Sequence, residues 1–246
     1  MAKTVAIVNE DGGVGKSTTA FYLSRSLASK GKRVLLVDFD PLSDLPSALN
    51  LNLTGEHSFV DYLVSVAKDL KSDLAIDEML RDEGLIYPTE YGFDVLSSGA
   101  DLVSLEMKLL NVDSREFVLK RMLDGLTSNY DFIIIDTPSS CGLLTENALV
   151  SADYVLIPVR CNYDANKVLT GMLQTIISVR NQANGRLSIL GILLTRCNPQ
   201  GRTVAKISRE LKTIYGEMMF TTLIFERMDV LEQYNALADE VMKRSL

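Results

Sequence analysis

Apolar positions in this chain follow two alternating patterns. Short runs of aliphatic residues, such as Phe132–Ile135, are typical of strands that are buried on both faces of a sheet. Longer stretches between them repeat apolar residues every three or four positions, which indicates amphipathic helices. We predict strands at Thr4–Asn9, Arg33–Val37, Phe93–Leu96, Phe132–Asp136, Tyr154–Pro158 and Ser188–Thr195, and weaker ones at Leu85–Tyr87 and Met219–Leu223.

Helical patterns separate most of these strands. We predict them at Ser17–Lys30, Ser58–Asp69, Ala75–Arg81, Leu102–Leu110, Arg115–Ser128, Leu144–Val150, Lys167–Asn181, Arg202–Tyr215, Val230–Leu237 and Ala238–Arg244. The alternation predicts an α/β fold with a doubly wound, mainly parallel sheet flanked by helices. Because no linker or repeat interrupts the pattern, we predict a single domain over residues 1–246.

Composition limits the classes of function. A net charge of −7 argues against nucleic-acid binding by the whole surface, so any DNA contact needs a local basic patch. Three cysteines without C-x-x-C spacing predict neither a disulfide framework nor an iron–sulfur site. The sequence starts without a signal-peptide pattern and has no apolar run of about 18 residues. We therefore expect a cytoplasmic protein that does not bind membranes.

A glycine-rich turn joins the first predicted strand to the first predicted helix. Glycines let the backbone N–H groups turn toward an anion, and the helix N-terminus adds its positive dipole end. A lysine in the turn can reach the β- and γ-phosphates of a nucleotide, and the next hydroxyl can bind Mg²⁺. The predicted phosphate-binding residues are Gly12, Gly13, Val14, Gly15, Lys16, Ser17 and Thr18.

Two further strands end in carboxylates. Strand alternation places Asp38 and Asp40 on one side, and Asp136 ends the run Phe132–Ile135. Carboxylates beside a phosphate loop repel a nucleotide unless a cation lies between them, so we predict Mg²⁺ held by Ser17, Asp38 and Asp136. The alternatives are a solvated turn at Asp38–Asp40 and a buried structural role for Asp136. The predicted catalytic residues are Asp40, Lys16 and Asp136.

Taken together, these motifs resemble the ParA/MinD family of P-loop ATPases with a deviant Walker A motif, in its ParA-like branch. The resemblance rests on Gly12-Gly13-Val14-Gly15-Lys16-Ser17, Asp38-Phe39-Asp40-Pro41 and Ile134-Ile135-Asp136-Thr137-Pro138, and it extends nearly from end to end of the chain. It implies weak ATPase activity with ATP and Mg²⁺, a homodimer in the ATP-bound state, and a separate adaptor protein that stimulates hydrolysis. It also implies that Asp40 orients the attacking water.

The resemblance further places the adenine near Asn198, Pro199 and Phe225, although the family usually has proline at Phe225. A second departure is Asp11, which stands where the family has a lysine that reaches the phosphates of the partner subunit. At about 4 Å and an effective dielectric near 20, two like charges repel by about 4 kcal/mol. Asp11 therefore needs an explanation.

Three explanations of Asp11 are open. Nucleotide-driven dimerisation is lost; or Asp11 pairs with a cation of the partner; or another cation replaces the lysine, as in relatives that position carboxysomes. Lys167, acting across the dimer, is our first candidate for that replacement, and Arg160 is the second. The alternative for Lys167 is an ordinary exposed helix lysine.

A basic series marks one predicted helix, at Arg202, Lys206, Arg209 and Lys212. Residues at this spacing lie near one face and suit non-specific contact with DNA phosphates, which would associate the protein with the nucleoid. The alternative is a solvated helix face. The predicted function is an ATPase that partitions or positions a plasmid, chromosome or protein organelle. A metabolic ATP-dependent synthetase on the same fold, and a nucleotide-regulated scaffold with little turnover, remain alternatives.

Overall fold

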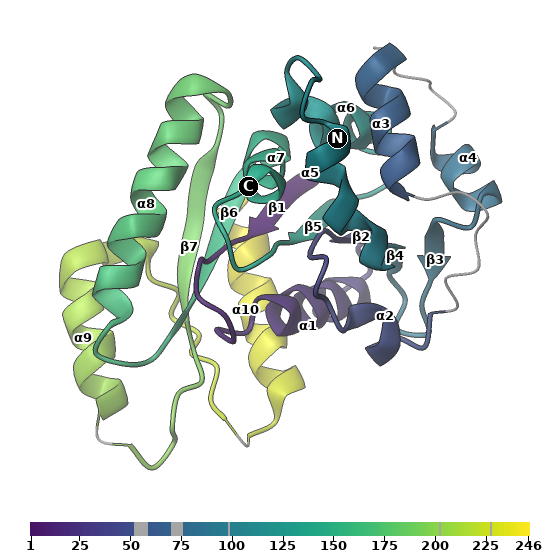
Figure 1. Ribbon diagram of the computed structural model, residues 1–246. Coiled ribbons are helices and arrows are strands. Elements are labelled where there is room, and N and C mark those ends of the chain that lie inside the picture. Colours follow the sequence, from purple (N-terminus) through teal and green to yellow (C-terminus); the bar gives the residue numbers. More distant parts are fainter. Residues whose placement is uncertain (52–58, 70–75, 98, 202, 227) are drawn as a thin grey trace.

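The computed structural model describes residues 1–51, 59–69, 76–97, 99–201, 203–226 and 228–246, which form a central sheet with helices on both faces (Figure 1). The described strands form one sheet in the order β3-β4-β2-β5-β1-β6-β7. Their bounds are β1 Lys3–Ile7, β2 Val34–Asp38, β3 Ile86–Pro88, β4 Asp94–Ser97, β5 Phe132–Asp136, β6 Tyr154–Arg160 and β7 Ser188–Thr195.

All neighbouring strands pair in parallel except β3 and β4, which are antiparallel. The doubly wound, mainly parallel sheet is therefore confirmed. In a parallel sheet the carboxyl ends of the strands share one edge, so residues that follow β1, β2, β5, β6 and β7 gather there. Sequence-distant loops thus come together at this edge.

The α-helices are bounded as follows: α1 Lys16–Ser29, α2 Leu45–Ala48, α3 Phe59–Asp69, α4 Ile76–Asp82, α5 Leu105–Lys108, α6 Val118–Asp124, α7 Leu143–Ser151, α8 Ala165–Gln182, α9 Thr203–Tyr215 and α10 Val230–Arg244. Short 3₁₀ helices cover η1 Gly99–Ser104, η2 Arg115–Phe117 and η3 Gly216–Met218. None of the helices in the described ranges is long and apolar enough to cross a membrane.

Two apolar cores lie on opposite faces of the sheet. Alternate residues of β1 point to opposite sides, so Val5 and Ile7 pack with α1 and α10, while Ala6 joins the other core. That second core contains side chains from α3, α6, α7 and α8. Figure 1 shows α1 and α10 together on one side of the strands.

Several predicted elements were wrong in detail. Met219–Leu223 is not a strand, because only an isolated bridge from Met219 to Ile192 and a few backbone bonds join this segment to β7. The two helices predicted over 230–244 are one helix, α10. The helix predicted at Leu102–Leu110 is largely the 3₁₀ turn η1 followed by α5.

Candidate functional site

The glycine-rich loop between β1 and α1 is held in place by its neighbours. Gly13 and Gly15 adopt φ of +69° and +90°, a region that favours glycine. Asn9 Nδ2 donates to the Pro158 carbonyl at 2.7 Å, and Thr195 Oγ1 donates to the Val14 carbonyl at 2.7 Å. The loop is thereby tied to the ends of β6 and β7.

Lys16 is buried at the start of α1. Its Nζ donates to the Asp11 carbonyl at 3.1 Å and to Ser139 Oγ at 2.5 Å. Burial lowers the pKa of Lys16, and the charges of Asp136, Asp40 and Asp11 act in the opposite direction. The ammonium thus lies between the glycine-rich loop and the loop that follows β5.

Asp38 and Asp136 face each other on neighbouring strands, because they are register partners at the carboxyl ends of β2 and β5. Ser97 Oγ donates to Asp38 Oδ2 at 2.9 Å. Asp38 Oδ1 and both oxygens of Asp136 are buried without a hydrogen-bond partner among the described residues. Burial raises the pKa of Asp38 to about 6 and that of Asp136 to about 8.

These orphaned oxygens fit Mg²⁺ well. Buried carboxylates without partners are costly, and a divalent cation offsets that cost. No group of three or more His, Cys, Asp or Glu side chains in the described ranges could hold a metal ion. Mg²⁺ usually binds through one or two carboxylates, waters and substrate phosphates, so two aspartates and the Ser17 hydroxyl are a suitable set.

Asp40 lies at the same edge but is only half-buried. Its Oδ1 accepts a hydrogen bond from Leu42 N at 2.9 Å, which holds the carboxylate next to the chain turn after β2. Its charge acts on Lys16 and on both buried aspartates, so it lies close to all three. A half-exposed carboxylate can contact a water molecule, whereas fully buried Asp136 cannot.

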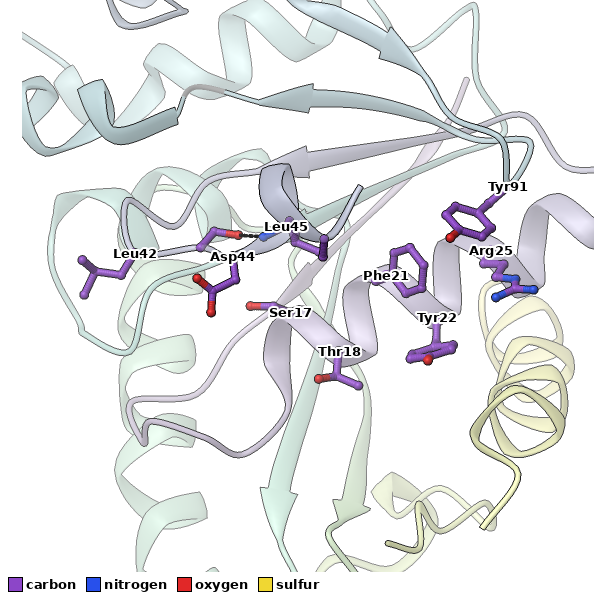
Figure 2. Close-up of a pocket in the computed structure, with 11 residues that line it drawn as sticks. Ser17, Thr18, Phe21, Tyr22, Arg25, Leu42, Asp44, Leu45 and Tyr91 are labelled. Carbon is purple, nitrogen blue, oxygen red and sulfur yellow. Dashed lines mark hydrogen bonds between the residues drawn. The ribbon is translucent and has the colours of Figure 1, made fainter. Parts of the chain in front are cut away.

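A pocket of about 520 Å³ opens next to Ser17 (Figure 2). The first turns of α1 form one wall, and the segment that includes Leu42, Asp44 and Leu45 forms the other. Figure 2 shows Arg25 and Tyr91 at the far end, with the Arg25 guanidinium 4.8 Å from the centre of the Tyr91 ring. A ligand can therefore reach the Ser17 hydroxyl from solvent along this side of α1.

Two arginines approach the outer side of the loop. Arg160, the last residue of β6, donates from Nη2 to the Gly12 carbonyl at 3.1 Å. A Cβ added to Gly13 would lie 3.3 Å from Arg160 Nη2 and 3.8 Å from Arg196 Nη2. Sequence reasoning named Arg160 only as a second candidate and missed Arg196. Its position one residue after β7, at the carboxyl edge, was the signal that could have found it.

The residues predicted to border the adenine are brought together. Cys197 and Phe225 form an isolated parallel bridge, and Glu226 N donates to the Cys197 carbonyl at 2.9 Å. Asn198 and Pro199 follow directly and are exposed. Thr195, two residues before Cys197, is hydrogen-bonded to the glycine-rich loop. Asn198, Pro199 and Phe225 therefore lie at the same edge of the sheet as that loop.

The remaining predicted residues lie on helix surfaces. Lys167 is exposed in the first turn of α8, and its side chain forms no hydrogen bond or ion pair with a described residue of the glycine-rich loop. Lys206, Arg209 and Lys212 are exposed on α9, whereas Arg202 lies outside the described residues. Lys206 Nζ is 3.9 Å from Glu210 Oε1, so part of its charge is compensated. Ser139, whose hydroxyl contacts Lys16, was not among the predicted site residues.

Comparisons with known proteins agree with this geometry. A family model described as an AAA domain matches residues 2–189. The chromosome partitioning protein ParA of Myxococcus xanthus (strain DK1622) is 36% identical over an alignment of 267 positions, which covers 99% of this chain and 89% of that protein. The sporulation initiation inhibitor protein Soj of Bacillus subtilis (strain 168) is 38% identical over 224 residues, covering 91% of this chain and 84% of that protein.

A solved structure is also similar. Cobyrinic acid a,c-diamide synthase from Mycobacterium smegmatis, with bound ADP and magnesium, has a TM-score of 0.84 and 28% identity, and the match covers 99% of this chain and 95% of that one. The strand order, the glycine-rich loop with its buried lysine and the two relatives lead to one conclusion. This chain belongs to the ParA/Soj family of P-loop ATPases.

Proposed function

We propose that this protein is an ATP-driven partition or positioning ATPase that dimerises with ATP, binds DNA non-specifically and releases its cargo when an adaptor protein stimulates hydrolysis. The observation that carries the proposal is the buried pair Asp38 and Asp136, which have unpartnered oxygens among the described residues, with the Asp136 charge acting on Lys16. They occur in a chain that is 36–38% identical to partition and sporulation-control relatives. Its place is the cytoplasm, next to the nucleoid.

In this proposal the loop holds the nucleotide phosphates, and Ser17, Asp38 and Asp136 hold Mg²⁺. The phosphate-binding residues are Gly12, Gly13, Val14, Gly15, Lys16, Ser17 and Thr18. Mg²⁺ supplies charge neutralisation at the phosphates. Lys16 binds the β- and γ-phosphate oxygens, and Asp40 orients the attacking water because its carboxylate is the half-exposed one. Hydrolysis is slow without the adaptor.

Asn198, Pro199 and Phe225 border the adenine in the same proposal, supported by the contact between Cys197 and Phe225. Lys167 reaches the phosphates of the partner subunit in place of the lysine lost at Asp11. Its support is limited to position, since it is exposed at the start of α8 on the loop-bearing edge. Lys167→Ala should then weaken both ATP binding and dimerisation, and an unchanged variant would remove Lys167 from the site.

DNA binding is assigned to Arg202, Lys206, Arg209 and Lys212. Arg209 and Lys212 are exposed and unpaired with any described acid, whereas Glu210 compensates Lys206. Arg209→Ala should reduce the slope of log affinity against log salt by about 1, and Lys206→Ala should reduce it less. Equal slopes in wild type and Arg209→Ala would place DNA contacts elsewhere.

The deciding experiment is the oligomeric state of the Asp40→Ala variant, which slows hydrolysis, by analytical ultracentrifugation. We expect monomers with ADP and dimers with ATP and Mg²⁺, and only the dimers should retain a long DNA duplex. The same state with both nucleotides would contradict the proposal. Wild-type protein controls for effects of the substitution itself.

One observation favours a second candidate, a carboxylate-activating synthetase. It is the similarity to the cobyrinic acid a,c-diamide synthase, at a TM-score of 0.84. This candidate predicts that ADP release is stoichiometric with consumption of a small carboxylic acid. Incubation with ATP, ammonium and a panel of such acids tests it, with Lys16→Met as the inactive control.

A further inference from the structure

The outer side of the glycine-rich loop carries charges of both signs that are not neutralised. Asp11, Arg160 and Arg196 are exposed there. Neither arginine forms an ion pair with a described carboxylate, and the Asp11 side chain makes no ion pair with a described base. Both guanidinium groups nevertheless converge within 4 Å of one point, the Cβ position of Gly13. We call Asp11, Arg160 and Arg196 the loop rim.

The two arginines are held there by the sheet. Cys161 N donates to the Thr195 carbonyl at 2.9 Å, which links the residues that follow β6 and β7. Each arginine precedes a cysteine, Cys161 or Cys197, and the neighbouring Cys197 thiol lowers the pKa of Cys161. Arg196 has φ of +50°, unusual for a side chain of this size. Such strain persists where the surroundings enforce it, often at functional positions.

The mixture of charges selects the kind of partner. A free anion or DNA would be attracted by the two arginines but repelled by Asp11. A surface that carries the same mixture fits better, because a twofold axis sets the acid of each copy against the bases of the other. A second copy of this chain supplies that surface with no further component.

We propose that, in the ATP-bound dimer, Asp11 of each copy forms an ion pair with Arg196 of the other, and that Arg160 positions the loop for this contact through its bond to the Gly12 carbonyl. The inference rests on the proposed ATP-dependent dimer and explains the aspartate at this position. The acid that would repel a partner's phosphates instead meets a partner's guanidinium. Lys167 remains free to approach those phosphates.

Charge exchange tests the contact. In the Asp40→Ala background with ATP and Mg²⁺, we expect Arg196→Asp and Asp11→Arg each to raise the dimer dissociation constant at least about tenfold, because each change acts twice across the axis. The double variant Asp11→Arg/Arg196→Asp should restore dimerisation to within about threefold of the parent. Binding of a fluorescent ATP analogue to dilute, monomeric protein shows whether each variant still folds and holds nucleotide.

Matched controls are Arg186→Asp and Asp113→Arg, the same charge changes at exposed positions away from the rim. Arg186 precedes β7 and so lies at the opposite edge of the sheet; neither control should change the dissociation constant. An Asp11→Arg dimer tighter than the parent would overturn the inference, because it would show that this position meets phosphate. So would single variants without effect, or a double variant that stays weak. A parent that remains monomeric with ATP would overturn the proposed function and this contact together.

Discussion

The charges of Asp136 and Asp11 both act to raise the pKa of Lys16, yet the two carboxylates lie in opposite surroundings. Asp136 is fully buried, its two oxygens have no partner in the described part of the chain, and its pKa is raised to about 8. Asp11 is exposed on the loop rim, and within the described part of the chain only its backbone groups make hydrogen bonds.

The difference separates two uses of charge. A buried carboxylate loses its hydration, so it is stable as an anion only when a cation is bound, and this makes it a specific ligand. An exposed carboxylate keeps its hydration and is screened by salt, so it contributes little until a partner surface removes water from it. The buried site formed by Lys16 and Asp136, which we call the buried corner, therefore suits chemistry at a bound nucleotide. The loop rim suits association with a partner surface.

Lys16→Met should have the largest effect, because it removes the ammonium from the buried corner and keeps a chain of similar length. We expect kcat/KM for ATP to fall on the order of 10²–10³-fold, as a preorganised cation at the phosphates is lost. Phosphate release under steady-state conditions measures it. Lys3→Met, at the opposite edge of the sheet, is the control and should retain activity. If Lys16→Met kept more than a tenth of wild-type activity, the buried corner would not be the part of the molecule that carries the chemistry.

Asp136→Asn should change the pH dependence of stability. The ordinary pKa of 3.8 is raised to about 8 in the folded protein, so between these values the folded state keeps a proton that the unfolded chain has lost. The free energy of unfolding therefore falls as pH rises from about 4 to about 8. Without nucleotide or Mg²⁺, Asp136→Asn should flatten this slope and stabilise the protein at pH 8 by about 1–3 kcal/mol. The free energy of unfolding, measured in urea at several pH values, would contradict this prediction if it changed equally with pH in the two proteins.

Gly13→Ala and Gly15→Ala sharpen the description of the rim. Both glycines have positive φ, so each alanine should cost about 1–2 kcal/mol of unfolding free energy. A Cβ at Gly13 meets Arg160 Nη2 at 3.3 Å, whereas a Cβ at Gly15 meets nothing within 4 Å. Gly13→Ala alone should thus alter the salt dependence of the ATP-bound dimer. Identical salt dependence in both variants would show that Arg160 does not position the rim.

Ser139→Ala should have the smallest effect. It removes the exposed hydroxyl that accepts a hydrogen bond from Lys16 Nζ at 2.5 Å, a bond worth about 0.5–1.5 kcal/mol. The KM for ATP should rise a few-fold, and the melting temperature should fall by no more than a few degrees. Ser140→Ala, whose hydroxyl forms no bond with Lys16, is the matched control. Equal KM values in the two variants would remove Ser139 from the set that orients Lys16.

Much of the fold was predictable from local patterns. β5 and β7 have their predicted bounds, and the other main strands differ by one or two residues at an end, because buried strands leave continuous apolar runs. The segment Met219–Leu223 was mistaken for a strand because it is apolar and partly buried, yet it bonds to β7 at only a few points. The single helix α10 was divided between Leu237 and Ala238, although both are buried there together with Tyr234 and Val241.

By itself, the sequence determined the glycine-rich loop between the first strand and helix, the order of alternating elements and the carboxylates at strand ends, since these depend on spacing within a few residues. Tertiary structure alone decided that Asp38 and Asp136 are register partners with orphaned oxygens. It also decided that Arg196, some 180 positions after Gly13, lies beside it. Burial and proximity depend on which strands become neighbours, and that order is set by packing of the whole sheet.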